Sequence, residues 1–307
     1  MRSWKIGLLV LAVVGIASTT GVATAAGRTD NAMPMPAGTT AGFIAYDRVA
    51  GKVTAQHLAH HRFRSASLVK ILIALDYLAT RAPDAGIPAD DRPLLESMLR
   101  SSNDDAANVF WGRGGGPAIV SRMITRIGLT ESAPPPPGYP GWWGYTALTA
   151  SDVVKIYQYV LSTAPAPVRG FVMGNLRQST RCATDGRDQH FGIPRAVAGP
   201  WAVKQGWSRF PDPVPPAERC TPAAAQTTSP HGPADVGMDA PNPPVSVRVA
   251  GGDLDLTRRA MHTSGTIGAG DRTILVVLTL EGLDTPWNES AARITRLAAA
   301  VYRAGRT

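Results

Sequence analysis

Strand patterns lie at both ends of the chain, and helical patterns fill its middle. Residues 42–47 and 52–56 predict two strands joined by a turn, and residues 260–267 and 273–280 predict two more near the C-terminus. Between them, apolar residues recur at helical spacing. We therefore expect an α/β fold: an antiparallel sheet completed by both ends of the chain and flanked by terminal helices, with an all-helical subdomain inserted over about residues 66–200.

Two further segments complete this expected architecture. Residues 202–207 predict a short strand. A closing helix presents Ile294 and other apolar residues on one face, behind an N-terminal cap at Asn288 or Ser290. The whole folded domain is expected to span residues 41–307.

The first 26 residues have the pattern of a secretory signal peptide. Arg2 and Lys5 supply the positive start, residues 6–17 the apolar stretch, and Ala23-Thr24-Ala25 a small-residue cleavage site. The apolar stretch is short for a membrane span, although an uncleaved N-terminal anchor remains the alternative. No cysteine lies at the cleavage region, so a lipoprotein anchor is not indicated. Either way, we expect a secreted, periplasmic or cell-envelope-associated protein.

Composition changes mark a linker and an insertion. Residues 27–40 predict a linker, and residues 211–244 hold ten prolines with little periodicity, which predicts an irregular or partly disordered surface insertion.

Cys182 and Cys220 are the only cysteines, and in an oxidising compartment they are expected to form a disulfide. We expect a monomer.

The charge and the histidines exclude several classes of function. The formal charge is +8, and 29 basic against 23 acidic residues remain without Arg2 and Lys5. The arginines are scattered, and export removes most nucleic-acid partners, so the charge indicates weak attraction to anionic envelope polymers.

The histidines within residues 57–61 are predicted to lie in a solvated loop and not at a zinc site. We expect no metal and no cofactor.

A Ser-x-x-Lys spacing opens the most apolar helical segment. Residues 63–78 predict a loop that turns into a buried helix, with Ser65 as its N-cap. Ser67 and Lys70 are one turn apart and share a face. A desolvated lysine can activate a serine hydroxyl, and a helix N-terminus favours the oxyanion that such a serine creates.

Alone, this spacing is weak evidence for an active site, because a capped core helix whose Lys70 side chain extends to water would show the same pattern. The choice of cations favours the chemical interpretation. Arginine supplies nearly all the positive charge, and the only lysines after the leader are Lys52, Lys70, Lys155 and Lys204. Arginine cannot give up its proton at a useful pH, so a site that needs a neutral amine requires lysine.

Three motifs in order resemble one enzyme superfamily. Ser67-x-x-Lys70, a Ser-Asn-Asp element at Ser102, and Lys204-Gln205-Gly206 on a strand are similar to the motifs of serine β-lactamases and penicillin-binding proteins. The chain looks closest to the class A β-lactamase-like serine hydrolases of actinobacteria, over residues 42–304. The resemblance implies a β-lactamase/transpeptidase-like fold.

The resemblance also implies a mechanism. Ser67 would be the acylated nucleophile and Lys70 its general base, while Ser102 would relay a proton to the leaving amine. Lys204 would keep the site positive and attract the substrate carboxylate. The backbone N–H groups of Ser67 and Trp207 would form the oxyanion hole. Substrate contacts would come from Trp207 and from three neighbours of these motifs: Asp104, Gln205 and Gly206.

The chain departs from the superfamily pattern in both later motifs. The second can be aligned on Ser101 or on Ser102; the helix that follows favours Ser102 and puts Asp104 where the family often has asparagine. In the third motif, Gln205 replaces the threonine or serine whose hydroxyl usually contacts the substrate carboxylate. These changes put the substrate preference in doubt.

A third departure concerns deacylation. The Glu-x-x-Leu-Asn loop of class A β-lactamases is missing from residues 132–149, and Glu131 is the only carboxylate nearby. We therefore expect an exported serine hydrolase acting on peptidoglycan-derived or other small amides and esters, with slow release of penicillins. The alternatives are a true class A-like β-lactamase and a non-enzymatic envelope protein that binds wall fragments. A pure binder has no need of two costly buried lysines.

Overall fold

The computed structural model describes Met1, Met35 and residues 37–80, 86–221, 246–249 and 252–306. Three predicted segments lie outside these residues in whole or in large part. They are the signal peptide (1–26), the linker (27–40) and the proline-rich insertion (211–244).

A five-stranded antiparallel sheet organises the described chain, in the order β2-β1-β9-β8-β5. Its strands are β1 (Thr40–Asp47), β2 (Lys52–His57), β5 (Trp201–Ser208), β8 (Arg259–Ile267) and β9 (Thr273–Glu281). The two ends of the chain meet where β1 pairs with β9, and Ala45 lies opposite Leu275. The predicted fold class is confirmed.

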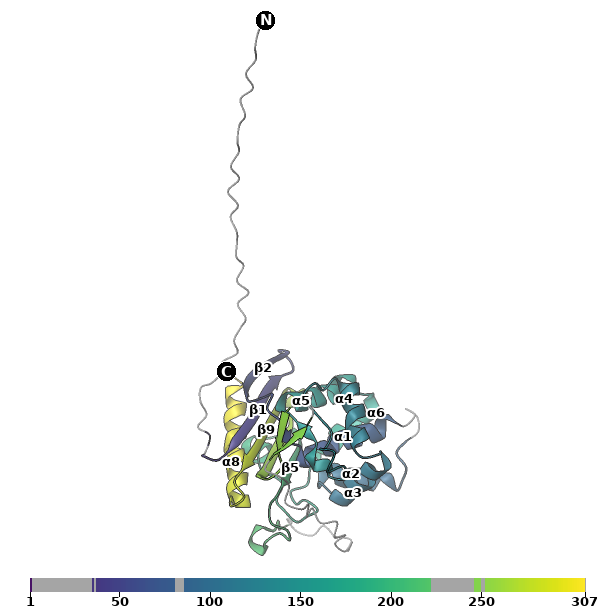
Figure 1. The fold of residues 1–307 in the computed structure, drawn as a ribbon, viewed down its shortest axis with the longest axis vertical. Helices are drawn as coiled ribbons and strands as arrows, with labels where there is room; N and C mark the ends of the chain where they lie inside the picture. Colours follow the sequence, from purple (N-terminus) through teal and green to yellow (C-terminus); the bar gives the residue numbers. More distant parts are fainter. Residues whose placement is uncertain (2–34, 36, 81–85, 222–245, 250–251, 307) are drawn as a thin grey trace.

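Alternation along β9 explains why this sheet is covered on both faces. Ile274, Val276 and Leu278 join the core beneath the helices, whereas Leu275 and Val277 point to the opposite face. That opposite face is covered by α8 (Trp287–Ala304), which lies on the left of Figure 1. Because both faces are buried, the strand is almost continuously apolar.

The start of α8 differs from the prediction. The helix begins at Trp287, directly after Pro286, so neither Asn288 nor Ser290 is its N-cap. The Ser290 hydroxyl instead donates to the buried Glu281 carboxylate at 2.6 Å. Proline suits a helix start because its fixed φ suits the turn and it lacks the N–H that would go unpaired there.

The middle of the chain forms the predicted helical insertion, on the right of Figure 1. Its helices are α1 (Lys70–Ala79), α2 (Asp91–Arg100), α3 (Asp104–Arg113), α4 (Pro117–Ile127), α5 (Ala150–Gln158), α6 (Ala166–Arg177) and α7 (Ile193–Ala196). Shorter helical segments are η1 (Ala66–Val69), η2 (Trp143–Tyr145), the π-helical η3 (Tyr159–Thr163), η4 (Pro216–Glu218) and η5 (Ala269–Asp271). Two small strand pairs accompany them: β3 (Phe63–Arg64) with β4 (Ala147–Leu148), and β6 (Ser246–Val249) with β7 (Gly252–Asp255).

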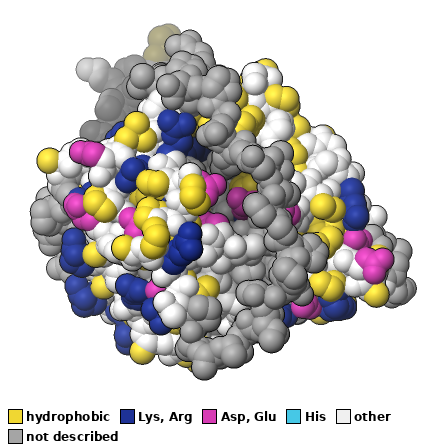
Figure 2. All heavy atoms as spheres, turned by 90° about the horizontal axis from the view of Figure 1, so that it is seen from below, with side chains coloured by type: hydrophobic (Ala, Val, Ile, Leu, Met, Phe, Trp, Pro, Cys, Tyr) yellow, Lys and Arg dark blue, Asp and Glu magenta, His cyan; other side chains and the backbone are white. Residues whose placement is uncertain are grey.

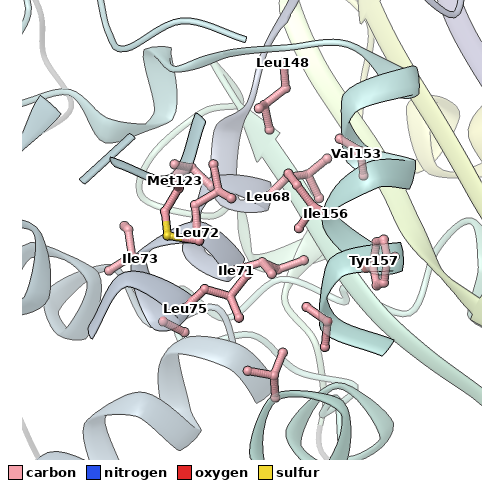
Figure 3. Close-up of a cluster of buried hydrophobic side chains, with 14 of the residues drawn as sticks. Leu68, Ile71, Leu72, Ile73, Leu75, Met123, Leu148, Val153, Ile156 and Tyr157 are labelled. Atoms are coloured by element: carbon pink, nitrogen blue, oxygen red, sulfur yellow. The ribbon is translucent and has the colours of Figure 1, made fainter. Parts of the chain in front are cut away.

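Helix α1 is the centre of this helical half. It contacts α2, α3, α4 and α6, and most of its residues are buried. Figure 3 shows Ile71, Leu72 and Leu75 among side chains from the helices around them. Close packing of this kind fixes a helix in position and rotation. The residues at its first turn are therefore held rigidly.

The surface of the described residues carries mixed charge. On the face in Figure 2, Lys and Arg side chains lie among Asp and Glu side chains. Within the described ranges, no helix has both the length and the apolar character needed to cross a membrane. In the same ranges, no group of three or more His, Cys, Asp or Glu side chains is placed to hold a metal ion.

The predicted disulfide is present. Cys182 and Cys220 are bonded with their Cα atoms 5.4 Å apart, across a sequence separation of 38 residues. The bond joins a turn at residues 182–188 to the segment that follows β5. Cys220 N also donates to Gly186 O at 2.7 Å, so a backbone hydrogen bond and the disulfide both connect the two segments.

We predict that this disulfide contributes strongly to stability. A cross-link closing a loop of this length stabilises by roughly 4 kcal/mol in the chain-entropy model. The Cys182→Ala/Cys220→Ala variant should therefore unfold at a clearly lower urea concentration than the oxidised protein. Reduced wild-type protein should match the double variant. Equal unfolding midpoints for oxidised and reduced protein would contradict the prediction.

Candidate functional site

Ser67 lies on a tight turn and not within an α-helix. It belongs to η1, and α1 begins only at Lys70. Ser65 occupies the N-cap position of η1, as predicted, but its hydroxyl does not accept from a helix N–H; it donates to the carbonyls of Ala66 (3.1 Å) and Gly144 (3.3 Å). Ala66 has a φ of +44°, which is rare for a residue with a side chain. Strained backbone of this kind concentrates at active sites.

The Lys70 amine is the centre of a hydrogen-bonded cluster. Its Nζ donates to Ser67 Oγ at 3.0 Å, to Ser102 O at 2.6 Å and to Ser102 Oγ at 3.2 Å. It also forms an ion pair with Asp104, whose side chain is 55% exposed. The lysine side chain itself is fully buried. The cluster thus lies inside the protein, and Asp104 marks where it meets solvent.

Ser102, and not Ser101, has its hydroxyl between the two lysines. Lys204 Nζ donates to Ser102 Oγ at 2.9 Å, opposite the contact from Lys70. The Ser101 hydroxyl donates to Ser97 O at 2.9 Å and accepts from Thr184. The alignment of the second motif on Ser102 therefore agrees with the geometry.

Backbone conformation explains why the two serines diverge. Ser102 has a φ of +59°, which reverses the chain between α2 and α3. Asn103 then caps α3, with its side-chain oxygen accepting from Ala106 N at 3.1 Å. The Ser-Asn pair of the motif thus has two tasks: the serine faces the lysines and the asparagine begins the helix.

Gly206 allows β5 to approach the Ser67 turn. A Cβ atom at this position would lie 3.1 Å from Ser67 N and 3.2 Å from Ser65 O. Real Cβ atoms rarely come this close to other atoms, and backbone cannot move aside easily. A side chain here would therefore require the Ser67 turn to shift by a few tenths of an ångström. Glycine brings the backbone of Gly206 and Trp207 against the turn that carries the serine, where an oxyanion hole would need it.

Burial shifts the pKa values of both lysines. Removal from water lowers the pKa of Lys70, and the Asp104 carboxylate opposes this by raising it. The pKa of Lys204 lies well below its usual value, first because of burial and then because of the charge on Lys70. A buried amine with a lowered pKa can exist in the neutral form that a general base requires.

Gln205 does not point its amide at this cluster. Its Nε2 donates to Gln189 O at 3.2 Å and to Phe191 O at 2.5 Å, and the side chain is buried. The amide holds backbone segments together. The contact with a substrate carboxylate, expected from the third motif, is not supported by this geometry.

The Glu131 carboxylate is hydrogen-bonded outside the Ser67–Lys70 cluster. It accepts from Thr149 Oγ1 at 2.9 Å and contacts His60 Nδ1 at 2.8 Å. Among the described residues, it makes no hydrogen bond to Ser67 or Lys70. Lys70 instead has the ring of Trp143 beside it, with its Nζ 4.7 Å from the ring centroid.

One further acidic residue was missed by the sequence prediction. Asp185 accepts a hydrogen bond from Trp207 Nε1 at 2.9 Å and another from Arg187 N at 3.0 Å. Its charge acts on both Lys70 and Lys204, so it stands close to the cluster. Asp185 lies in the turn tied by the disulfide, and no motif in the sequence indicates it. The predicted cystine was the only sequence signal for this turn.

The sequence is similar to that of two mycobacterial proteins. No family model matches the chain. A protein of Mycobacterium tuberculosis named "Putative lipoprotein LppW" is 36% identical over 184 residues, which cover 58% of this chain and 57% of that protein. The Mycobacterium bovis protein of the same name matches equally. The match thus spans little more than half the length of these relatives.

Solved structures extend the likeness across most of the chain. A class A β-lactamase from Mycobacterium abscessus aligns with a TM-score of 0.57 at 16% identity, over 88% of this chain and 95% of that one. PBP-A aligns with a TM-score of 0.57 at 13% identity, over 89% and 92%. At such identities the likeness concerns the fold. The chain thus has the fold of the serine β-lactamases and penicillin-binding proteins.

Proposed function

We propose that this chain is an exported serine hydrolase that forms an acyl-enzyme at Ser67. Its substrates would be peptidoglycan-type peptides or related small amides and esters. One observation carries the proposal: Lys70 Nζ lies 3.0 Å from Ser67 Oγ and 3.2 Å from Ser102 Oγ, which Lys204 holds from the other side at 2.9 Å. Nucleophile, base and proton relay are therefore in continuous hydrogen-bond contact.

Acylation would begin with proton transfer to neutral Lys70. As Ser67 Oγ bonds to the substrate carbonyl carbon, its proton moves to Lys70 Nζ. The carbonyl oxygen takes the negative charge and would be stabilised by the N–H groups of Ser67 and Trp207. The close approach of β5 at Gly206 supports this arrangement.

Release of the leaving group would use Ser102. When the tetrahedral intermediate collapses, the bond from carbon to the leaving nitrogen or oxygen breaks. Ser102 Oγ gives its proton to that atom and takes one from the Lys70 ammonium. Lys70 is then neutral again, and an ester remains on Ser67. Lys204 would hold the Ser102 hydroxyl in place throughout this step.

The leader and the relatives support a location in the envelope. The mycobacterial relatives are named lipoproteins, and the leader of this chain has the pattern of an export signal. The only two cysteines are Cys182 and Cys220, so this leader offers no cysteine for lipidation. The mycobacterial origin of the sequence relatives supports an actinobacterial origin for this chain, and the solved structures support the class A-like fold.

The first prediction tests the nucleophile. A fluorophosphonate should add to the peptide that contains Ser67, and Ser67→Ala should remove the adduct completely. Lys70→Arg should label as poorly as Lys70→Ala, because arginine keeps the charge but cannot serve as a base. Peptide mapping by mass spectrometry measures both effects.

Four outcomes would count against this mechanism. An adduct on Ser102, or one that survives Ser67→Ala, would place the nucleophile elsewhere. A reactive Lys70→Arg variant would make Lys70 structural. Absence of any adduct on folded protein would favour a non-enzymatic protein that binds wall fragments.

The second prediction concerns pH. Ser67 can transfer its proton only to neutral Lys70, so acylation should speed up as pH rises through the pKa of Lys70. Asp104 raises that pKa. Asp104→Asn removes the negative charge and should move the rising limb of the pH–rate profile to lower pH. A limb that stays in place, or moves to higher pH, would show that Asp104 does not control the base.

The third prediction concerns turnover. Among the described residues, no glutamate lies beside Lys70 as in class A enzymes; the carboxylate there is Asp104, which forms an ion pair with the lysine. Loss of a positioned general base costs about 10²–10⁴-fold in rate. Nitrocefin should therefore give a burst of about one product per protein and then slow release. Glu131→Gln should leave this profile unchanged, because the Glu131 carboxylate binds His60 and Thr149.

Steady turnover would reverse this conclusion. Nitrocefin hydrolysis at ~100 s⁻¹ lies within the ordinary range for enzymes and would identify a true β-lactamase. In that case, the separate effects of Glu131→Gln and Asp104→Asn would show which carboxylate positions the water.

A further inference from the structure

An aromatic ring lies against the amine that the proposed mechanism uses as its base. The Nζ atom of Lys70 is over the ring of Trp143, 4.7 Å from the ring centroid. Both residues are buried. The face of an aromatic ring attracts a cation within about 6 Å of its centroid, most strongly in tryptophan and where water is excluded. The geometry is therefore that of a cation–π interaction.

The ring distinguishes the two protonation states of Lys70, because it attracts only the charged one. The hydroxyl oxygens of Ser67 and Ser102 lie 3.0 and 3.2 Å from Lys70 Nζ. A hydroxyl can accept a hydrogen bond from an ammonium group or donate one to a neutral amine, so these contacts suit both states. The face of the Trp143 ring carries partial negative charge and has no donor for the lone pair of a neutral amine. The ring thus favours the ammonium form.

Charged groups act on Lys70 from the other elements around it. Burial lowers its pKa, and three carboxylates in α3 and in the turn at residues 182–188 oppose this: Asp104, Asp185 and Asp105. The two lysines of the site repel each other, since the charge on Lys70 lowers the pKa of Lys204 in β5. The Asp104 side chain is 55% exposed, so solvent and salt screen its charge. The Trp143 ring is enclosed and is less affected by screening.

Asn108 holds the indole in this orientation. Trp143 Nε1 donates to Asn108 Oδ1 at 2.8 Å. Asn108 follows Asp104 by four residues in α3, so the two side chains lie on the same face of that helix. One face of α3 therefore supplies both the carboxylate that binds Lys70 and the acceptor that orients the ring.

The backbone that carries Trp143 is attached to the serine turn. Trp143 begins η2, which packs against η1. Ser65 N donates to Thr146 O at 2.7 Å, and Ser65 Oγ donates to Gly144 O at 3.3 Å. These bonds fix the position of the ring relative to the nucleophile and its base.

We propose that Trp143 is a positioning residue for the base: its ring binds the Lys70 ammonium that forms during acylation of Ser67, and Asn108 holds the ring in place. This inference rests on the proposed hydrolase function. The proton that charges Lys70 is the one that Ser67 Oγ loses as it bonds to the acyl carbon. The ring therefore has two opposite effects. It lowers the fraction of neutral Lys70 at low pH, and it stabilises the transition state in which Lys70 takes the proton.

The pH dependence of Ser67 labelling by a neutral fluorophosphonate separates these effects. Trp143→Leu keeps an apolar side chain but has no π face. It should move the rising limb of the pH–rate profile to lower pH by about one unit and lower the high-pH plateau at least about threefold. Trp143→Phe has a weaker ring, so its limb should lie between those of wild type and Trp143→Leu. Asn108→Ala should move the limb in the same direction by a smaller amount.

A direct titration of Lys70 gives a second readout that does not need acylation. The chain has five lysines, so labelling of lysine Cε with ¹³C gives few NMR signals, and Lys70→Arg identifies the signal of Lys70. The midpoint of its titration should fall by about one pH unit in Trp143→Leu, because the ammonium form loses its aromatic partner.

Trp111→Leu is the matched control. The Trp111 indole also links α3 to the loop before η2, since its Nε1 donates to Pro140 O at 3.1 Å, but the ring that lies over Lys70 Nζ is that of Trp143. This variant should keep the wild-type limb and midpoint, whereas loosening of the loop alone would affect both variants alike. Thermal unfolding confirms that each variant is folded.

Two results would overturn the inference. One is an unchanged or higher Lys70 midpoint in Trp143→Leu, and the other is an equal shift in Trp111→Leu. If Trp143→Leu does not fold, Trp143→Phe and Asn108→Ala carry the test, and wild-type midpoints in both would overturn the inference. Failure of the fluorophosphonate to label folded wild-type protein would instead reject the proposed function, and the Lys70 midpoints would still test the contact with the ring.

Discussion

The burial of the Lys70 amine is the constraint on which the site depends. An ammonium group withdrawn from water is costly unless other groups bind it, and its pKa falls as a result. Here the amine is supported by Ser67, Ser102 and Asp104, and the ring of Trp143 lies beside it. The apolar packing around α1 keeps water away. In the proposed mechanism, the same enclosure that disfavours the charged lysine would give Ser67 its base.

The site is assembled where the two halves of the fold meet. Ser67 and Ser102 come from the helical half, whereas Lys204 comes from the edge strand β5 of the sheet. Gly206 permits this close contact, because a side chain there would press on the Ser67 turn and force it to shift slightly. A small shift between sheet and helices would therefore separate the two lysines from their shared serine. The covered sheet and the tightly packed α1 both resist such a shift.

Much of this arrangement could be predicted from short-range patterns. Alternation and apolar runs predicted the strands, helical spacing between them predicted the helical insertion, and the resemblance carried by three motifs implied the β-lactamase/transpeptidase-like fold. Helix α6 was not predicted, because Gly170 and Gly174 lower its helix propensity and its packing through Val172 and Leu176 stabilises it. The sequence also misled about the Ser65 hydroxyl, which binds carbonyls across the turn, and it gave no sign of Asp185. Both depend on contacts between segments far apart in the chain, which local patterns do not record.

The Cys182–Cys220 disulfide relates the structure around the site to the compartment in which the protein folds. Thiols stay reduced in the cytosol of most bacteria, and disulfides form after export. The turn that carries Asp185 is fastened to the segment after β5 by Cys182 and Cys220. Under the proposed export, a chain still inside the cell would lack this covalent link beside the site. The final attachment of the turn would then depend on the compartment that the chain reaches.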